Sequence, residues 1–296
     1  MKIGVMLPFG GSDGPDGTMP SWTEVRTVAQ AVEQTGLDSV WLADHFLHRS
    51  PDGELSGMHE ALTLLTAVAA VTERVELGNL VLCSSFRDPG LTAKMAVTLD
   101  EISAGRLILG VGAGWHDPEY EAFGLPTDHR FSRFAEWLEI VVRLLRKETV
   151  TFDGTYYSTN EGVLVPAPKR RIPILVAGGR PKMLGLTAEW ADAWNAAWYG
   201  APNPEVAEKL NTLHQAVEAS SRPAGAVATT VGITVRDPEH DDGEPNPKVI
   251  GGSVEELAEA LRGYRDLGVE HVIAGLRPGT PRSVERLAEA KRLLDA

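Results

Sequence analysis

Short apolar segments alternate with amphipathic helical segments along almost the whole chain of 296 residues. Capping boxes at residues 21–24 and 253–256 begin two of the helices, and Asp88 followed by Pro89 begins another. About eight strand–helix repeats in a chain of this length predict an α/β fold, a (β/α)8 TIM barrel, with its active site at the carboxyl ends of the strands. The expected strands are residues 2–7, 39–43, 75–82, 107–111, 173–177, 193–197, 226–235 and 270–274.

Residues 149–172 interrupt this alternation with aromatic residues and prolines, and we interpret them as an insertion before the fifth strand. Asp153-Gly154 within the segment is a turn signal that favours a hairpin. The length as a whole fits one domain of barrel size, residues 1–296. A doubly wound sheet is the alternative architecture. It is less favoured because the glycines of residues 110–114 are spaced GxGxG, not GxGxxG, and lie far from the N-terminus.

The balance of charges limits the partners that the chain can bind. The sequence has 28 Lys and Arg against 41 Asp and Glu, a formal net charge of -13, which disfavours binding to nucleic acid or to an acidic membrane. Cys83 is the single cysteine, so an internal disulfide is excluded and a reducing compartment is expected. The first apolar run is interrupted at Pro8 and is too short for a signal peptide or a membrane span. The sequence therefore predicts a cytoplasmic protein.

Asp44 and His45 stand where the second strand is expected to end. A barrel presents its catalytic groups at that position. A histidine beside a carboxylate can be held in one tautomer and can transfer protons near neutral pH. We therefore predict His45 as a catalytic proton donor or acceptor, with Asp44 beside it. The structural alternative is a histidine satisfied by neighbouring backbone groups.

Three other expected strands end in residues that could line a ligand site. At glycines the bare backbone lets a planar or phosphorylated ligand approach amide groups closely. Gly178-Gly179 also precedes an expected helix, and the N-terminus of a helix favours a phosphate. Tight packing and turn formation are the structural alternatives, and Cys83 could be only a small buried residue. No histidine–carboxylate spacing resembles a metal site. The candidate ligand-binding residues are Asn79, Leu80, Val81, Cys83, Gly112, Ala113, Gly114, Ala177, Gly178, Gly179 and Arg180.

Taken in order, five segments resemble the luciferase-like monooxygenase superfamily of flavin and deazaflavin oxidoreductases, and specifically its coenzyme F420-dependent branch. The resemblance covers nearly the whole chain and is far more specific than any one glycine loop. The segments are DSVWLADHF (38–46), ELGNLVLCSSFRDPG (76–90), LDEISAGRLILGVGAGWHDPEYEAFG (99–124), ILVAGGRP (174–181) and ADAWN (191–195).

The resemblance implies that the isoalloxazine-type ring of a cofactor lies at the strand ends, close to residues 44–45. Relatives bulge against the ring at the place of residues 80–81, often through a non-prolyl cis peptide, and we predict such a bond here. The two glycine loops, residues 112–114 and 177–179, would contact the polar tail and phosphate of the cofactor. Arg87, Lys94 and Arg180 are candidates for the basic patch that an anionic tail requires.

This sequence departs from the sugar-phosphate dehydrogenases of the deazaflavin branch at one position. Those relatives carry a glutamate after the glycine loop, where Trp115 stands here. Glu119 is the residue that we consider as a substitute for their catalytic proton donor. Trp115 is expected to form an apolar wall of the substrate pocket, and its presence argues against a sugar-phosphate substrate.

The resemblance as a whole implies an F420-dependent oxidoreductase that transfers a hydride between the deazaflavin and a small organic substrate, which carries a carbonyl, an alcohol or an activated alkene. The cofactor would perform the hydride chemistry, while the protein binds it, aims it and supplies proton transfer. The alternatives are an FMN-dependent monooxygenase that uses reduced flavin and oxygen, and a flavin-binding homologue without turnover. Dimers are common among relatives, so a homodimer is a further expectation.

Overall fold

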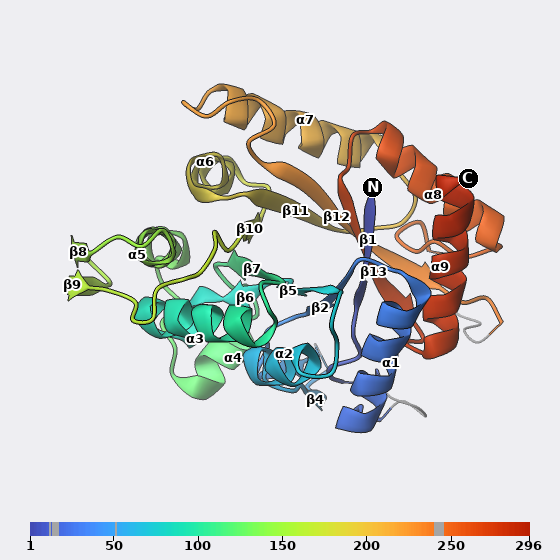
Figure 1. Ribbon diagram of the computed structural model, residues 1–296, viewed down its shortest axis with the longest axis horizontal. Helices are drawn as coiled ribbons and strands as arrows, with labels where there is room; N and C mark the ends of the chain where they lie inside the picture. The colour runs from blue at the N-terminus through green and yellow to red at the C-terminus, as the bar shows by residue number, and fades with distance from the viewer. Residues whose placement is uncertain (12, 14–17, 51, 240–245) are drawn as a thin grey trace.

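The computed structural model describes residues 1–11, 13, 18–50, 52–239 and 246–296, and its central feature is a closed sheet of parallel strands (Figure 1). Each strand is hydrogen-bonded to the next, and the parallel pairing of the fourth barrel strand with the fifth closes the circle. The predicted (β/α)8 barrel is confirmed. In order around the barrel the strands are β1 (Lys2–Met6), β2 (Ser39–Leu42), β5 (Glu76–Asn79), β7 (Leu107–Gly112), β10 (Ile174–Ala177), β11 (Ala193–Tyr199), β12 (Ala228–Arg236) and β13 (His271–Arg277).

Helices surround the barrel on its outer side (Figure 1). Both expected capping boxes are present, since Ser21 and Ser253 each accept a hydrogen bond from the third helical amide and the glutamate there returns one. Asp88 caps a third helix in front of a proline, as the sequence predicts. The helices that follow the barrel strands are α1 (Trp22–Thr35), α2 (Ala61–Ala69), α3 (Pro89–Ile102), α5 (Arg130–Leu145), α6 (Pro181–Trp190), α7 (Pro204–Glu218), α8 (Val254–Asp266) and α9 (Pro281–Asp295).

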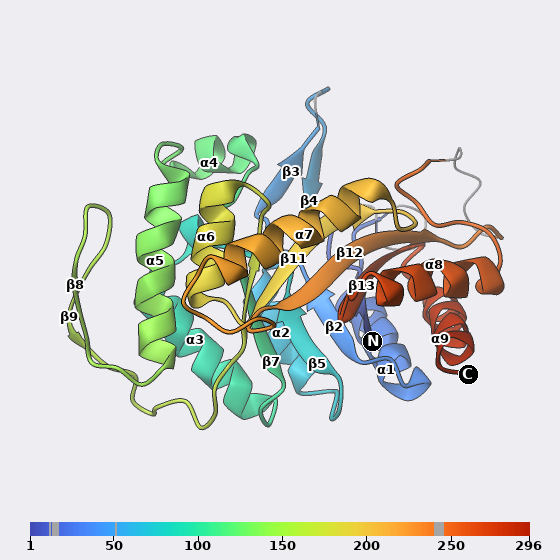
Figure 2. The same cartoon turned by 90° about the horizontal axis from the view of Figure 1, so that it is seen from above.

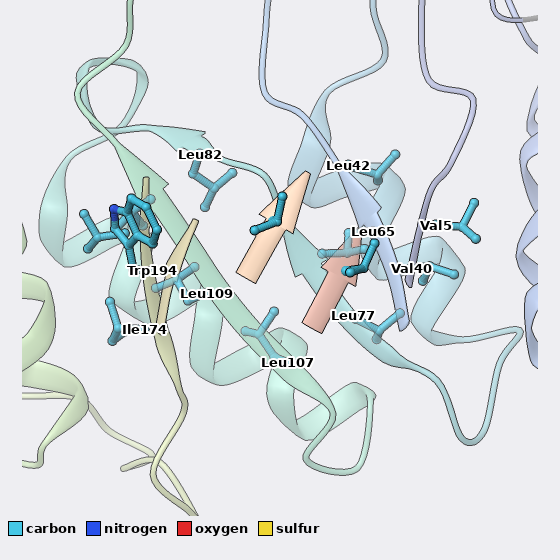
Figure 3. Packing of buried hydrophobic residues seen from close by; sticks show 14 of the residues in the cluster. Val5, Val40, Leu42, Leu65, Leu77, Leu82, Leu107, Leu109, Ile174 and Trp194 are labelled. Carbon is cyan, nitrogen blue, oxygen red and sulfur yellow. The ribbon is translucent and has the colours of Figure 1, made fainter. Parts of the chain in front are cut away.

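The strands bury side chains on both of their faces, as a parallel barrel requires. Leu77, Leu107 and Leu109 belong to the cluster that packs strands against helices (Figure 3). A smaller cluster combines strand residues with Leu80, which follows β5, and has none from a helix, so it fills the barrel interior around Trp41. Gly78 is needed there, because a Cβ on it would lie 2.2 Å from the Trp41 ring. The buried members of this interior cluster are Met6, Trp41, Leu80, Leu175 and Ile273.

Three segments interrupt the regular repeat. The expected hairpin before the fifth strand is confirmed as the antiparallel pair β8 (Val150–Asp153) and β9 (Ser158–Gly162), which Figure 2 shows standing out beside α5. A second antiparallel hairpin, β3 (Leu47–Arg49) with β4 (Leu55–Gly57), lies in the loop after β2, where the sequence analysis expects only a polar loop. A short helix, α4 (Asp117–Phe123), follows the glycine loop after β7. The β3–β4 hairpin and α4 both lie in loops at the carboxyl ends of the strands, where the site is predicted.

No helix in the described ranges combines the length and the apolar composition needed to cross a membrane.

Candidate active site

A cavity of about 1530 Å³ opens at the carboxyl ends of the barrel strands. Ordinary ligand pockets measure roughly 300–1,000 Å³, so this one has room for a cofactor together with a substrate. His45, the Leu80-Val81 peptide and both glycine loops line the same cavity, as the sequence analysis requires. The predicted site residues on its wall are Asp44, His45, Leu80, Val81, Cys83, Gly112, Ala113, Gly114, Trp115, Glu119, Ala177, Gly178, Gly179 and Arg180.

Asn79 is the predicted ligand-binding residue that does not line this cavity. Neighbouring side chains of a strand point to opposite faces. Gly78 faces Trp41 inside the barrel, so the fully buried side chain of Asn79 points outward, toward the helices. Its amide atoms have no hydrogen-bond partner among the described residues. Its assignment to the cofactor site stays a prediction that the cavity lining does not support.

The bond between Leu80 and Val81 is a non-prolyl cis peptide, as predicted, and both residues line the cavity. The bulge ends the regular strand β5, and the chain pairs with β7 again only at Leu82 and Cys83. Gly112 of β7 lies against the bulge, since a Cβ on it would be 2.7 Å from Val81 Cγ2. The bulge and the first glycine loop therefore form one continuous surface of the cavity.

His45 is held by a carboxylate that the sequence places far from it. Nδ1 of His45 lies 2.7 Å from Oε1 of Glu119, and the backbone amide of Phe46 donates to Oε2 of Glu119 at 2.7 Å. Glu119 is 1% exposed. Burial opposes its ionisation, but the hydrogen bonds from His45 and the backbone outweigh burial and hold the pKa of the carboxyl below its ordinary value. Glu119, and not Asp44 as expected, therefore holds the His45 ring.

Asp44 belongs to a different ion pair. Arg87 donates to both of its carboxylate oxygens, at 2.7 and 2.9 Å, and the Cys83 amide donates to it at 3.0 Å. Arg87 also pairs with Glu60, the residue that caps α2. The pKa of the Arg87 guanidinium is raised, because these two carboxylates outweigh its burial. Arg87 therefore fixes Asp44, which follows β2 and also binds the Cys83 amide after the cis peptide. Arg87 was expected to bind the anionic tail of the cofactor, but it does not line the cavity.

The first glycine loop is packed from behind by a buried tyrosine. Tyr120 donates to the Ala113 carbonyl at 3.0 Å, and its hydroxyl lies 3.2 Å from Cys83 Sγ. Gly114 has a φ of +78°, and a Cβ on it would lie 2.0 Å from the Tyr120 hydroxyl, so only glycine fits this turn. Burial raises the pKa of the Cys83 thiol to about 11. A raised pKa favours the neutral thiol, which packs against Tyr120 on the cavity wall.

The second glycine loop presents backbone at the N-terminus of α6. Trp194 donates its indole N–H to the Gly178 carbonyl at 2.9 Å and so fixes the orientation of that peptide. Gly178 has a φ of +130°, and the space beside Gly179 is open up to the Lys209 amine. No side chain caps the first turn of α6, and the N-terminus of a helix favours an anion. Arg180 lines the cavity beside them.

Of the three cations expected at an anionic tail, only Arg180 lies on the cavity wall. The Lys94 amine instead contacts the Val165 carbonyl beside α3.

Several cavity residues are missing from the sequence-based set because strand ends cannot be located to within one or two residues. Strand β11 runs to Tyr199, two residues further than expected, and so carries Trp198 to the cavity after a second non-prolyl cis peptide. The lining residues absent from that set include Lys182, Trp198, Lys248 and Arg277.

Trp115 stands at the mouth of the cavity and is 65% exposed. Its ring packs edge-on against His45, with the ring centroids 5.6 Å apart. His116, the next residue, turns away and accepts a hydrogen bond from the Arg49 amide at 3.0 Å. Burial and the neighbouring His48 lower the pKa of His116. In the part of the chain that the structure describes, no three His, Cys, Asp or Glu side chains are placed to hold a metal ion.

The sequence profile of the family described as luciferase-like monooxygenase matches residues 1–242. An F420-dependent glucose-6-phosphate dehydrogenase of Kineococcus radiotolerans is 34% identical over 210 residues, which are 69% of this chain and 61% of the relative. A pyrimidine monooxygenase of Allorhizobium ampelinum is 28% identical over 235 residues, 76% of this chain and 63% of the relative. The chain thus spans less than two thirds of the length of both relatives.

Among solved structures, an F420-dependent secondary alcohol dehydrogenase in complex with an F420–acetone adduct has a TM-score of 0.82 to this chain at 18% identity. The likeness covers 99% of this chain and 98% of the other, and it shows that the two share a fold. The match of the family profile covers more than half of the chain and confirms the resemblance seen in the five segments. The chain therefore belongs to the luciferase-like monooxygenase family.

Proposed function

We propose that the protein is a coenzyme F420-dependent oxidoreductase, which transfers a hydride between the deazaflavin and a small organic substrate with a carbonyl, an alcohol or an activated alkene. The observation that carries the proposal is the pairing of His45 with buried Glu119, on the wall of a cavity that also holds two bare glycine loops. The relative from Kineococcus radiotolerans and the secondary alcohol dehydrogenase are both F420-dependent by name, which supports this cofactor class.

The residues on the cavity wall fit such a cofactor. The Leu80-Val81 bulge offers an apolar surface for a flat ring, and the backbone of Gly112 and Gly114 faces the same space. The uncapped N-terminus of α6, with the bare backbone of residues 178–179, would hold the phosphate. Arg180 and Lys182 line the cavity at this helix and would neutralise the carboxylates of the tail. These groups support our proposal that the anionic part of the cofactor binds at this end of the cavity.

His45 would perform the proton transfer. When bound, the deazaflavin supplies the site that accepts or donates the hydride. Glu119, whose pKa is lowered, would accept a hydrogen bond from Nδ1 of the neutral His45 ring. In that tautomer Nε2 carries no proton and can take one from a substrate hydroxyl. In the reverse direction, protonated His45 gives this proton to a carbonyl oxygen. Glu119 acts as a positioning residue and stabilises the imidazolium, because both of its oxygens already bond to protein groups.

An FMN-dependent monooxygenase is the second candidate. FMN also carries a phosphate that the N-terminus of α6 would hold, and a pyrimidine monooxygenase is among the relatives. We favour the deazaflavin because its anionic tail extends beyond the phosphate and gives a function to Arg180 and Lys182, which lie on the cavity wall of a chain with a net charge of -13.

Fluorescence titration of the purified protein with F420 and, separately, with FMN distinguishes the two candidates. We expect F420 to bind at least about tenfold more tightly, a difference of roughly 1.4 kcal/mol, and the preference should shrink as salt screens the cations. Tighter binding of FMN would reject the deazaflavin assignment. A protein that binds F420 but exchanges no hydride with any alcohol, ketone or activated alkene would instead be the non-catalytic homologue.

A further inference from the structure

Strand β3 has one edge that β4 does not cover. The two strands form a sheet of their own, and amides two residues apart on a strand point to the same side. At the other edge, Oε2 of Glu119 accepts from the Leu47 amide at 3.4 Å, besides the Phe46 amide just before the strand. Nε2 of His116 accepts from the Arg49 amide at 3.0 Å. Two side chains that follow β7 therefore supply acceptors to an edge that β4 leaves unpaired.

The bond from Arg49 requires His116 to be neutral. A backbone amide can only donate, so Nε2 must carry no proton and the proton of the neutral ring is on Nδ1. Protonation of Nε2 would set one N–H against another and remove the bond. The pKa of the Glu119 carboxyl is lowered from 4.5, so the bonds that it accepts remain in mildly acidic solution. Of the two acceptors at this edge, His116 is therefore the one that can lose its bond by taking up a proton there.

The His116 ring also contacts the aromatic side chain at the cavity mouth. Trp115 packs against it at an angle of 64°, with the ring centroids 5.1 Å apart, and also packs against His45. His48 of β3 stacks on His116, with the centroids 4.7 Å apart and the planes 10° from parallel. Trp115 is 65% exposed and His116 is 5% exposed, so the buried ring anchors the exposed one. His116 thus connects β3 to Trp115.

Charged and titratable groups of both signs surround His116. Burial is the largest effect on the ring, and together with His48 and His45 it outweighs the carboxylates of α4, so the pKa of His116 is lowered from 6.5. The ring is therefore neutral at neutral pH. The groups of this kind that face it are His48 and Arg49 of β3, His45 after β2, Asp117 and Glu119 of α4, and Arg130 of α5, which pairs with Asp117.

A recess of about 440 Å³ lies beside these rings, separate from the main cavity. Its lining includes His48, Trp115, His116 and Asp117. Trp115 lines the main cavity as well, and His116 does not. A proton can therefore reach His116 from the recess without passing through the ligand site, and the recess is large enough for the ring to turn into it.

We propose that neutral His116 is a positioning residue that joins β3 to Trp115 at the cavity mouth and releases both when it takes up a proton from solvent. The neutral ring keeps the Arg49 amide and the Trp115 ring in place. The charged ring cannot accept from Arg49, is repelled by any charge on His48, and turns toward the recess. Trp115, the preceding residue in the chain, moves with it.

The pair of His45 and Glu119 is not released by this change. Glu119 keeps its bonds to the His45 ring and to the Phe46 amide, because neither depends on the His116 ring. The cavity mouth thus loosens in mildly acidic solution while the proposed proton-transfer group stays in position. The inference goes beyond the proposed function, because it holds for either candidate cofactor.

Hydrogen exchange of single amides, followed by NMR on the full chain, tests the bond directly. The Arg49 and Phe46 amides are compared about one pH unit above and below the midpoint of the His116 ring, which its own NMR titration supplies. We expect the protection factor of the Arg49 amide to fall at least about fivefold across this interval, and that of the Phe46 amide to change by less than about twofold. Equal falls at both amides or an unchanged Arg49 amide would overturn the proposal, and so would a His116 ring that stays neutral down to about pH 4.

Substitutions assign the effect to His116. Glutamine offers an acceptor oxygen and does not titrate, so His116→Gln should keep the Arg49 amide protected at both pH values, whereas His116→Phe should leave it weakly protected at both. His48→Gln removes a neighbouring charge and should move the His116 midpoint upward. His129→Gln is the matched control, because the His129 side chain is 63% exposed and lies in another cluster. A pH-dependent Arg49 amide in His116→Gln would place the titration on another group and overturn the proposal.

Near-UV circular dichroism tests the release of Trp115, since its signal depends on a fixed aromatic ring. The contribution of Trp115 is the difference between the spectra of the wild type and of Trp115→Phe. It should shrink by about half or more across the His116 midpoint, and should stay constant when the same pair is compared in the His116→Gln background. A constant contribution in the wild-type background would show that His116 does not hold Trp115, which contradicts the proposal.

Discussion

The Nδ1 atom of His45 lies 2.7 Å from Oε1 of Glu119, although the two residues are 74 positions apart in the sequence. His45 follows the second barrel strand, and Glu119 lies on the short helix α4 after the fourth. Glu119 is anchored by the Phe46 amide, so the carboxylate holds both the ring and the backbone beside it. The imidazole is thus held at Nδ1, and the proposed reaction would use its other nitrogen, Nε2.

Replacement of Glu119 by glutamine should slow turnover without loosening the cofactor. The amide keeps the shape of the side chain but loses the charge that stabilises an imidazolium, and a hydrogen bond to a charged group contributes about 1.5–3 kcal/mol. We expect kcat to fall roughly 10- to 100-fold, with the F420 Kd within about twofold, and His45→Ala to lower kcat further. Steady-state kinetics and fluorescence titration measure the two effects. An equal loss of cofactor binding and turnover would assign Glu119 a structural role only.

Removal of Arg180 and Lys182 together should weaken F420 binding. Each lines the cavity at the start of α6, and a charge-assisted contact at a partly exposed site contributes roughly 1 kcal/mol. The double alanine variant should therefore raise the F420 Kd about tenfold or more at low salt, and less at high salt. Lys169→Ala serves as the control, since Lys169 is an exposed residue that pairs with Glu101 away from the cavity. An unchanged Kd at low salt would move the anionic tail elsewhere.

Alanine at Gly114 should destabilise the protein more than alanine at Gly36. The two glycines have similar φ angles, +78° and +82°, so both variants bear the cost of a left-handed alanine, about 1–2 kcal/mol. The Gly36 Cβ would meet nothing within 4 Å, whereas the Gly114 Cβ would lie 2.6 Å from Cys83 Sγ. The added overlap should bring the loss at Gly114 to about 3 kcal/mol or more. Urea unfolding gives both values, and equal losses would show that the loop yields to the added methyl group.

Replacement of Arg87 by methionine should destabilise the fold through Asp44. The pair is almost fully buried, with side chains 9% and 1% exposed, and an unpaired buried charge costs about 3–5 kcal/mol. Asp44→Asn added to Arg87→Met should recover part of that loss, because the remaining buried group is then neutral. Thermal or chemical unfolding of the two single variants and the double variant measures the coupling. Additive losses would mean that Arg87 acts through Glu60 instead.

His271 should make the protein less stable at mildly acidic pH. It is buried at the start of β13, with Nε2 2.8 Å from Ser39 Oγ, and burial, with a smaller effect from Lys2, lowers its pKa from 6.5 to about 3. The unfolded chain therefore binds one proton more between these values, so the contribution of neutral His271 is complete above pH 6.5 and is lost as the pH falls toward about 3.

Between pH 6.5 and about 3, the free energy of unfolding should fall by about 1.4 kcal/mol for each pH unit. The test compares urea unfolding of the wild type and of His271→Gln at about pH 7.5 and at about pH 5.5, since other groups titrate equally in both proteins. The free energy of unfolding of the wild type should fall by roughly 1.4 kcal/mol more than that of the variant. Parallel pH dependence in the two proteins would place the titration on other residues.

Local patterns were sufficient to predict the repeat and much of the cavity wall. Asp88 and the capping-box serines begin their helices where expected, because a cap depends on residues within one turn. The carboxyl ends of parallel strands meet at one end of a barrel, so residues that follow different strands could be assigned to one site before their distances were known. The hairpin after β2 escaped prediction because its strands are three residues long and lack the usual period-two signal.

The sequence by itself determined the barrel, the glycine loops and the position of His45 at a strand end, because these follow from local periodicity and chain order. Only the tertiary structure decided which charges meet. Arg87 was expected at the cofactor tail but pairs with Asp44, and Glu119, not Asp44, holds His45. The partners of a buried charge are set by the packing of strands and helices that are distant in sequence. Because an unpaired buried charge is costly, it pairs with the opposite charge that this packing places nearby.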